Sequence, residues 1–364
     1  MRAILIVITI LFGASAVSAQ FVQTSAGKVE LTPMVTGLDE PWSIGFLPDG
    51  GYLVTEREGN LLFVNDGASK NVRGVPRVVA SGQGGLLDVM IPRNFSQTRD
   101  VFLSYSKAMS GGAGTAVAVG QLSLDGGTLS NIRDLFQMNR GSNSGRHFGS
   151  RIVEAEDGTL FVMLGERGDA SAAQDLTLHH GSLIRINRDG SIPRDNPFVG
   201  QAGALPEIYS YGHRNIQGGA LDLHGTLWTA EHGAQGGDEI NSIRKGANYG
   251  WPVISFGVHY SGEKIGKGTA QAGMEQPAHY WDPSIAPSGL MIYSGKLWPQ
   301  WRGDLFVGSL KFDYISRLAG DNLREVEQLK STETERVRDI VEAPDGAIWF
   351  ISVGRKAIYR MAPI

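Results

Sequence analysis

The chain has 364 residues, of which 41% are hydrophobic and 19% are charged, and this balance excludes a disordered, collagen-like or coiled-coil protein. Its 33 Lys and Arg against 37 Asp and Glu give a formal net charge of -4, and without a basic block we expect no nucleic-acid partner. Cysteine is absent, which excludes disulfides, thiolate metal sites and cysteine nucleophiles, so any metal ligand must be an oxygen or a histidine nitrogen.

The N-terminus has the three parts of a secretory signal peptide. Arg2 supplies a positive charge, residues 3–12 form an apolar run, and small residues at 17–19 precede Gln20. The apolar run is shorter than the about 20 residues that span a bilayer. We therefore expect a cleaved signal peptide at 1–19 and a periplasmic or secreted protein that does not span the membrane, with residues 20–364 as one domain. An uncleaved N-terminal anchor is the alternative.

A short pattern recurs along the rest of the chain and predicts the fold. In it, a turn that contains Gly or Asp precedes an apolar strand, and its copies lie at 48–54, 99–103, 156–162, 223–228, 302–307 and 344–350. Units of 40 to 60 residues with short strands and glycine-rich turns are typical of propeller blades. We expect an all-β protein, a six-bladed β-propeller of four-stranded antiparallel blades, with one short helix at 170–178. A two-domain β-sandwich is the alternative.

The loop at 142–151 contains the first candidate catalytic residue. It is rich in Gly and Ser, carries His147, and leads into an apolar strand. A histidine held in a loop on a rigid scaffold can act as a general base near neutral pH. A structural histidine that hydrogen-bonds its own loop is the alternative interpretation.

Two later segments contain groups that bind anions or cations. Arg214 and Asn215 lie side by side between glycines at 209–218, a pairing that suits a planar, oxygen-rich anion, although an ordinary salt bridge is the alternative. The segments 231–241 and 248–252 combine acids with glycines. Carboxylates and backbone carbonyls are ligands that calcium prefers, but the spacing is not that of an EF-hand loop.

The C-terminal part adds three cations. Lys311 follows an apolar segment, and Arg336 and Arg338 are two residues apart, a spacing that places both on one face of a strand. Together with Arg214 they could form a cationic cup for a ligand with several negative charges. A solvated, charged strand face is the competing interpretation.

Motifs along nearly the whole chain occur in the same order as in one known protein family. The relevant segments are 37–42, 48–50, 82–87, 147–151, 164–166, 187–193, 195–197, 212–218, 238–241, 248–252, 286–288, 309–311 and 336–339. In these segments the chain resembles the soluble, pyrroloquinoline-quinone (PQQ)-dependent aldose sugar dehydrogenases of the glucose/sorbosone dehydrogenase family, which are six-bladed propellers.

The resemblance implies roles for individual residues. His147 would be the general base, and Arg214 would stabilise charge that develops on the quinone. The implied contacts to the quinone's carboxylates and carbonyls are Gln83, Arg214, Asn215, Lys311, Arg336 and Arg338. Tyr260 would stack on the cofactor. The implied calcium ligands are the carbonyls of Gly233 and Ala234 at the cofactor, and Glu239 and Tyr249 at a second, structural ion.

The resemblance also implies the reaction: oxidation of the anomeric hydroxyl of an aldose sugar to a lactone, with hydride transfer to PQQ, calcium as Lewis acid and an external electron acceptor. Glucose-specific members have Pro where this chain has Ala234, and they carry long insertions and a dimer-forming calcium site that this chain lacks. We therefore expect a monomer and no particular preference for glucose. A calcium-dependent propeller lactonase and a non-catalytic sugar-binding propeller are the alternatives.

Overall fold

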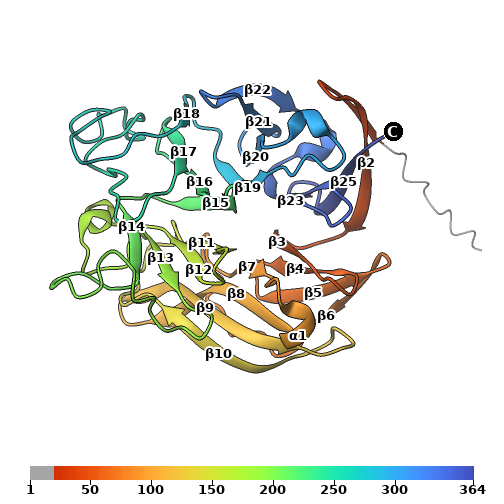
Figure 1. Cartoon of the computed structure of the whole chain (residues 1–364), viewed down its shortest axis with the longest axis horizontal. Helices are drawn as coiled ribbons and strands as arrows, with labels where there is room; N and C mark the ends of the chain where they lie inside the picture. Colours follow the sequence, from red (N-terminus) through yellow and green to blue (C-terminus); the bar gives the residue numbers. More distant parts are fainter. Residues whose placement is uncertain (1–19) are drawn as a thin grey trace, which may run out of the picture.

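The computed structural model describes residues 20–364, so the predicted signal peptide lies outside the described residues. The described strands form six sheets around a central axis (Figure 1). Every strand pair within these sheets is antiparallel. The predicted six-bladed propeller is therefore confirmed. Among residues 20–364, no helix has the length and apolar character needed to cross a bilayer.

Five blades have four strands each, and in each of them the chain runs outward from the axis (Figure 1). From the innermost strand outward, the blades are β3 (Pro41–Phe46), β4 (Tyr52–Glu56), β5 (Asn60–Asn65) and β6 (Ala68–Asn71); β7 (Leu86–Met90), β8 (Asp100–Met109), β9 (Gly112–Leu122) and β10 (Leu129–Gln137); β11 (Gly149–Glu154), β12 (Leu160–Leu164), β13 (Ser182–Ile186) and β14 (Ile208–Tyr211); β15 (Ile216–Leu221), β16 (Leu227–Glu231), β17 (Asp238–Ser242) and β18 (His279–Trp281); and β19 (Pro287–Ile292), β20 (Leu305–Ser309), β21 (Ile315–Ala319) and β22 (Arg324–Leu329).

The sixth blade differs from the predicted four strands because both ends of the described chain contribute to it. It runs from β23 (Val337–Glu342) through β24 (Ile348–Ser352), β25 (Ala357–Pro363) and β2 (Gly27–Thr36) to β1 (Gln20–Thr24). The pairing of β2 with β25 extends from Val29 opposite Pro363 to Thr36 opposite Ala357. Backbone hydrogen bonds between distant parts of the sequence thus close the ring.

The recurring turns found in the sequence lie at equivalent places in all six blades, between the innermost strand and the next one. Gly50, between β3 and β4, has a φ of 102°, and Gly346, between β23 and β24, has a φ of 89°; only glycine adopts such values without strain. The described helical segments are short: α1 (Phe95–Thr98), and the 3-10 turns η1 (Ala170–Gln174), η2 (Pro299–Trp301) and η3 (Thr332–Thr334).

The hydrophobic core lies between neighbouring blades. Leu53 of the first blade packs in one cluster with Leu86 and Leu103 of the second blade. Phe102, on the opposite face of β8, packs with Val162 of the third blade. Both faces of a blade are thus covered by apolar side chains, and their removal from water is the main force that holds the ring together.

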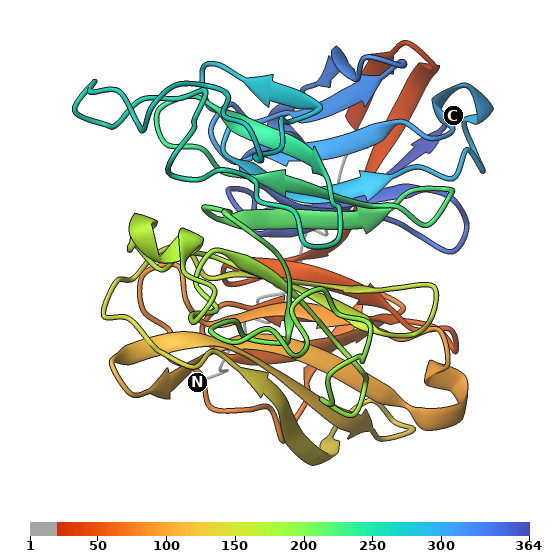
Figure 2. The same ribbon diagram turned by 60° about the vertical axis from the view of Figure 1, so that its left-hand side comes forward.

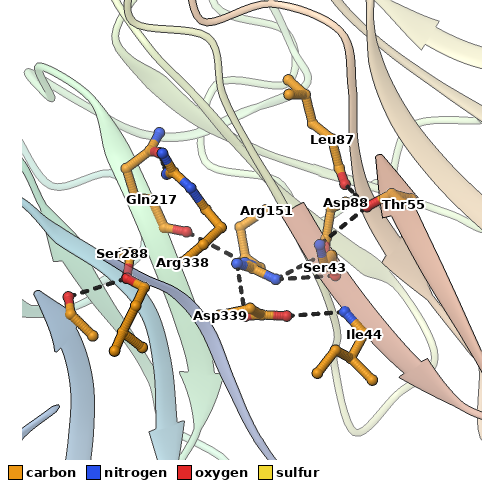
Figure 3. A network of polar contacts seen from close by, with 12 residues as sticks. Ser43, Ile44, Thr55, Leu87, Asp88, Arg151, Gln217, Ser288, Arg338 and Asp339 are labelled. Carbon is orange, nitrogen blue, oxygen red and sulfur yellow. Dashed lines mark hydrogen bonds and ion pairs between the residues drawn. The ribbon is translucent and has the colours of Figure 1, made fainter. Parts of the chain in front are cut away.

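At the axis, a buried ion network joins the innermost strands (Figure 3). The Arg151 guanidinium in β11 lies 2.8 Å from the Asp88 carboxylate in β7 and 3.0 Å from the Asp339 carboxylate in β23. Asp88 also accepts a hydrogen bond of 2.6 Å from the Ser43 hydroxyl in β3, and Asp339 accepts one of 3.1 Å from the backbone of Ile44. Three blades are therefore held to the blade that carries Arg151.

Two further hydrogen bonds complete the connection around the axis. Arg151 Nε donates to the carbonyl of Gln217 in β15 at 3.3 Å, and the Ser288 hydroxyl in β19 donates to the carbonyl of Val337 in β23 at 2.6 Å. Burial alone would lower the pKa of Arg151, but Asp339 and Asp88 outweigh it and raise this pKa. The guanidinium is therefore charged at every physiological pH.

The network gives a prediction for stability. Arg151→Met should lower the free energy of unfolding by about 3–5 kcal/mol, because it leaves two buried carboxylates without their cation. Urea unfolding at pH 7 measures this loss. Arg360→Met is the control: Arg360 lies 2.7 Å from Asp345 in an exposed ion pair, and such a pair contributes about 0–1 kcal/mol. Equal losses in the two variants would show that the network has no special role.

Candidate active site

A cavity of about 560 Å³ lies at the end of the propeller axis where the innermost strands begin. Five of the predicted site residues line it: Gln83, Asn215, Lys311, Arg336 and Arg338. Trp42 also lines the cavity, and the guanidinium of Arg151 lies over its ring, 4.7 Å from the centroid. The cavity therefore adjoins the axial ion network.

The cationic cup contains charges without counter-charges. Among residues 20–364, no carboxylate forms an ion pair with Arg214, Lys311, Arg336 or Arg338. Burial, together with Arg336 and Arg151, lowers the pKa of Arg338 to about 10. Lys311, Arg336 and Arg338 therefore lie together in the lining of one cavity. The alternative of a solvated strand face does not apply to Arg338, because it lines the cavity and is only partly exposed.

Hydrogen bonds fix the orientation of the amide groups at the cavity. Arg338 Nη1 donates to Gln217 Oε1 at 3.0 Å, and Gln217 Nε2 donates to Asn215 Oδ1 at 3.2 Å. The backbone N–H of Gly149 donates to the same Asn215 oxygen at 3.1 Å. Because Oδ1 already accepts two bonds, Asn215 can offer its Nδ2 donors to a ligand in the cavity.

The loop that carries His147 is held beside this cavity. The His147 backbone N–H donates to Gln83 Oε1 at 2.7 Å, and the Gln83 backbone N–H donates to the Gly145 carbonyl at 2.6 Å. The His147 side chain is buried, with 7% of the residue exposed, and its backbone has a φ of 57°. Positive φ is uncommon for a residue with a side chain and requires support from its surroundings.

Glu166 is a functional candidate to which the sequence analysis gave no role, although it lies in the matching segment 164–166. Its Oε1 lies 2.7 Å from His147 Nδ1. Gly165 permits this approach, since a Cβ there would lie 2.0 Å from the His147 carbonyl oxygen. With Nδ1–H donating to the carboxylate, the neutral ring keeps its lone pair on Nε2, which has no hydrogen-bond partner within residues 20–364.

Opposing influences set the pKa of His147. Burial lowers it, the hydrogen bond and charge of Glu166 raise it, and Arg214 and Arg146 lower it, with a net shift below the usual 6.5. His232, which lines the cavity and donates from Nε2 to the Pro287 carbonyl at 2.6 Å, has a pKa lowered to about 3 by burial and by Arg214 and Arg338. Both imidazoles are therefore neutral near pH 7.

Arg214 does not line the cavity itself but lies between these groups. Its Nη1 donates to the His232 carbonyl at 3.3 Å, and its guanidinium lies over the Trp251 ring, 5.3 Å from the centroid. Its backbone N–H donates to the carboxylate of Glu231. Since Arg214 influences the pKa of both His147 and His232, it lies within electrostatic reach of both rings.

The segment predicted to hold calcium lies between β16 and β17. Gly233 and Ala234 are buried there, and the Gly233 N–H donates to Asp238 Oδ1 at 2.8 Å. Glu239 is directly opposite Glu231 in the strand pair, and burial together with the charge of Glu231 raises the pKa of Glu239 to about 8. No group of three or more His, Asp and Glu side chains that could hold a metal ion occurs within residues 20–364.

The two predicted tyrosines lie away from the cavity lining. The Tyr249 hydroxyl donates to the Ser242 carbonyl at 2.6 Å and accepts from the Arg244 N–H at 2.8 Å, and its ring stacks on His213. Tyr260 is 72% exposed. It belongs to the connection between β17 and β18, which projects from the body of the molecule in Figure 2.

Comparison with known proteins places the chain among sugar dehydrogenases. The glucose/sorbosone dehydrogenase family profile matches residues 38–360. The chain is similar to the Escherichia coli aldose sugar dehydrogenase YliI, with 44% identity over 324 residues that cover 86% of this chain and 87% of the relative.

Two solved structures are also similar. One is the soluble aldose sugar dehydrogenase (Asd) from Escherichia coli in its apo form, with 41% identity, a TM-score of 0.89, and coverage of 92% of this chain and 100% of that one. The other is the PQQ-bound aldose sugar dehydrogenase (Adh) from Streptomyces coelicolor, with 25% identity, a TM-score of 0.76, and coverage of 92% and 98%.

The contact between His147 and Glu166 gives a prediction that needs no ligand. An NMR titration of the His147 ring should give a pKa below 6.5, and Glu166→Gln should lower this pKa further, because the carboxylate favours the protonated ring. Asp169→Asn is the control, because this partly exposed carboxylate pairs with Arg140 and does not contact His147. An unchanged or higher pKa in Glu166→Gln would contradict the assigned contact.

Proposed function

The chain belongs to the glucose/sorbosone dehydrogenase family, and from this premise we propose how it works as a PQQ-dependent aldose sugar dehydrogenase: it oxidises the anomeric hydroxyl of an aldose to a lactone. The observation that carries this proposal is the cationic cup at a cavity of about 560 Å³, whose charges have no carboxylate partner within residues 20–364. Where such a cation is buried, as Arg214 is with 6% of the residue exposed, it costs free energy unless an anion neutralises it.

The cavity fits PQQ, which is a planar quinone with several carboxylates. Lys311, Arg336 and Arg338 would bind those carboxylates, because guanidinium and ammonium groups form strong charge-assisted hydrogen bonds with them. Asn215 and Gln83 would add amide contacts at the cavity wall. The resemblance also assigns Tyr260 to stack on the cofactor, although its exposed ring does not line the cavity in this structure.

When bound, PQQ supplies the acceptor for the hydride of the anomeric carbon, and calcium supplies a Lewis acid beside it. His147 Nε2 takes the hydroxyl proton as the C–H bond breaks and the lactone carbonyl forms, a contribution of about 10²–10⁴ to the rate. Glu166 holds the ring and stabilises its protonated form. Arg214 stabilises the negative charge that develops in a site with little water.

Two calcium sites complete the proposal. The carbonyls of Gly233 and Ala234 would hold the ion at the cofactor, and Glu239 and Tyr249 would hold a structural ion. The opposed carboxylates of Glu231 and Glu239 support the second site, because their mutual repulsion contributes to the raised pKa of Glu239 and a cation would relieve it. Oxygen ligands of this kind suit calcium.

The cellular setting follows from the signal peptide predicted at 1–19. Export would place the protein, as a monomer, in the periplasm or outside the cell, where an external electron acceptor would receive the electrons. A calcium-dependent lactonase or a sugar-binding propeller would have no use for four cations that lack carboxylate partners in the described part of the chain, so both alternatives are less well supported.

The direct test is dye reduction by the purified mature protein with a panel of aldoses, with and without PQQ and calcium. We expect reduction only when both are present, and the panel ranks the sugars in the same experiment. If no aldose reduces the dye and PQQ does not bind, the proposed function is wrong. Reduction without calcium would remove only the Lewis acid from the proposal.

His147→Ala tests the assignment of the base. We expect turnover to fall by about 10²–10⁴ while the affinity for PQQ, followed by fluorescence quenching, stays close to that of the parent. A turnover within a few-fold of the parent would exclude His147 as the base.

Lys311→Ala tests the cationic cup. Loss of a charge-assisted contact of about 1.5–3 kcal/mol should weaken PQQ binding by about 10- to 100-fold, measured by reconstitution at limiting PQQ. Lys245→Ala is the matched control, because Lys245 lies 3.8 Å from Asp195 in an exposed ion pair that does not belong to the cavity lining. Equal PQQ affinities in the two variants would contradict the role of Lys311.

A further inference from the structure

Arg167 is a buried cation that the proposed reaction does not use. It directly follows Glu166, its exposure is 0%, and its backbone has a φ of 59°. No carboxylate forms an ion pair with it among the residues that the structure describes, 20–364. Burial lowers its pKa to about 10. A buried charge without a counter-ion is costly, so other groups must compensate for it.

Backbone carbonyls provide this compensation. Arg167 Nη2 donates to the Ser144 carbonyl at 2.7 Å and to the Ala113 carbonyl at 3.2 Å, and Nη1 donates to the Arg146 carbonyl. Ser144 and Arg146 belong to the loop that carries His147, whereas Ala113 belongs to β9 of the second blade. One guanidinium therefore ties the loop to a neighbouring blade.

Two further contacts strengthen this connection. The Arg167 carbonyl accepts a hydrogen bond of 3.0 Å from the Ser142 hydroxyl at the start of the loop. The guanidinium also lies over the Phe148 ring, 3.3 Å from its centroid, an arrangement in which cation and ring attract each other. Phe148 follows His147 and lines the cavity. Arg167 thus contacts the loop on both sides of His147 without lining the cavity itself.

We propose that Arg167 is the positioning residue of the loop at 142–149: it fixes where His147 meets the substrate, and this role rests on the proposed function of His147. The loop is rich in Gly and Ser and holds His147 at positive φ, so its own sequence does not determine its shape. The planar guanidinium satisfies three carbonyls in fixed directions, which the single ammonium of a lysine cannot match.

The experiment compares Arg167→Met and Arg167→Lys with the parent, in the full mature protein. With saturating PQQ and calcium, we expect kcat to fall by about 10²-fold in Arg167→Met, since a shift of about 1 Å in a catalytic group costs that much. The KM for the aldose and the PQQ affinity should stay within about threefold, because Arg167 touches neither ligand. Arg167→Lys should recover little of this loss.

Hydrogen exchange followed by mass spectrometry gives a second result that does not depend on activity or on PQQ. In Arg167→Met, amides at 142–149 should exchange about tenfold faster or more, as expected when a segment loses its local protection, while those of β11 and β12 should be unchanged. Faster exchange spread over the whole third blade would instead indicate general destabilisation and would overturn the proposal.

Arg185→Met is the matched control. Arg185 is a buried arginine of the same blade, but it pairs with Asp157 and Asp195 and lies in β13. Its loss should reduce stability while leaving kcat and exchange at 142–149 unchanged.

Three results would overturn the proposal: a kcat of Arg167→Met within twofold of the parent, full recovery in Arg167→Lys, or equal effects in the Arg185 variant. If the parent itself oxidises no aldose, the proposed function fails, and the exchange measurement still decides whether Arg167 orders the loop.

Discussion

The structure depends on one buried ion network, in which the Arg151 guanidinium lies between the Asp88 and Asp339 carboxylates at the propeller axis. Apolar packing between blades favours a ring, but it does not fix the position of each innermost strand along the axis. The directional contacts of Arg151 fix this for β7, β11 and β23 (Figure 3). Some of the cavity residues, such as Leu87, Gly149 and Arg338, lie on these same strands, so the network also holds part of the site in place.

Two neighbouring residues of β23 show how closely the axial ion network and the cavity are connected. Asp339 faces the axial network, whereas Arg338 reaches the cavity and donates to Gln217. Burial, and after it the repulsion from Arg336 and Arg151, lowers the pKa of Arg338 to about 10. An anionic ligand would remove this repulsion, so cofactor binding and fold stability are linked by mass action.

The sequence predicted the features that depend on local chemistry. The six recurring turns predicted six blades. Lys311 and Arg338 were predicted from their charge and from the family motifs, and both line one cavity. It did not predict the five-stranded blade, because the β2–β25 pairing joins opposite ends of the chain. Arg167 escaped notice, since its partners are backbone carbonyls that no local pattern reveals. Arg151 was found only as part of the motif at 147–151, because its partners are carboxylates of two other blades. Glu166 was found only as part of a motif, because its role depends on the ring that it meets.

The five-stranded closing blade determines when the site can exist during biosynthesis. Strands β1 and β2 are made early and pair with each other, but they join the rest of their blade only when β25 is made. Arg336 and Arg338 lie at the start of that same blade, so they reach the cavity only when the ring closes. A chain that is still being synthesised is therefore an open arc without the complete cavity. If PQQ binds at this cavity as proposed, it can be loaded only after the last blade has joined the ring.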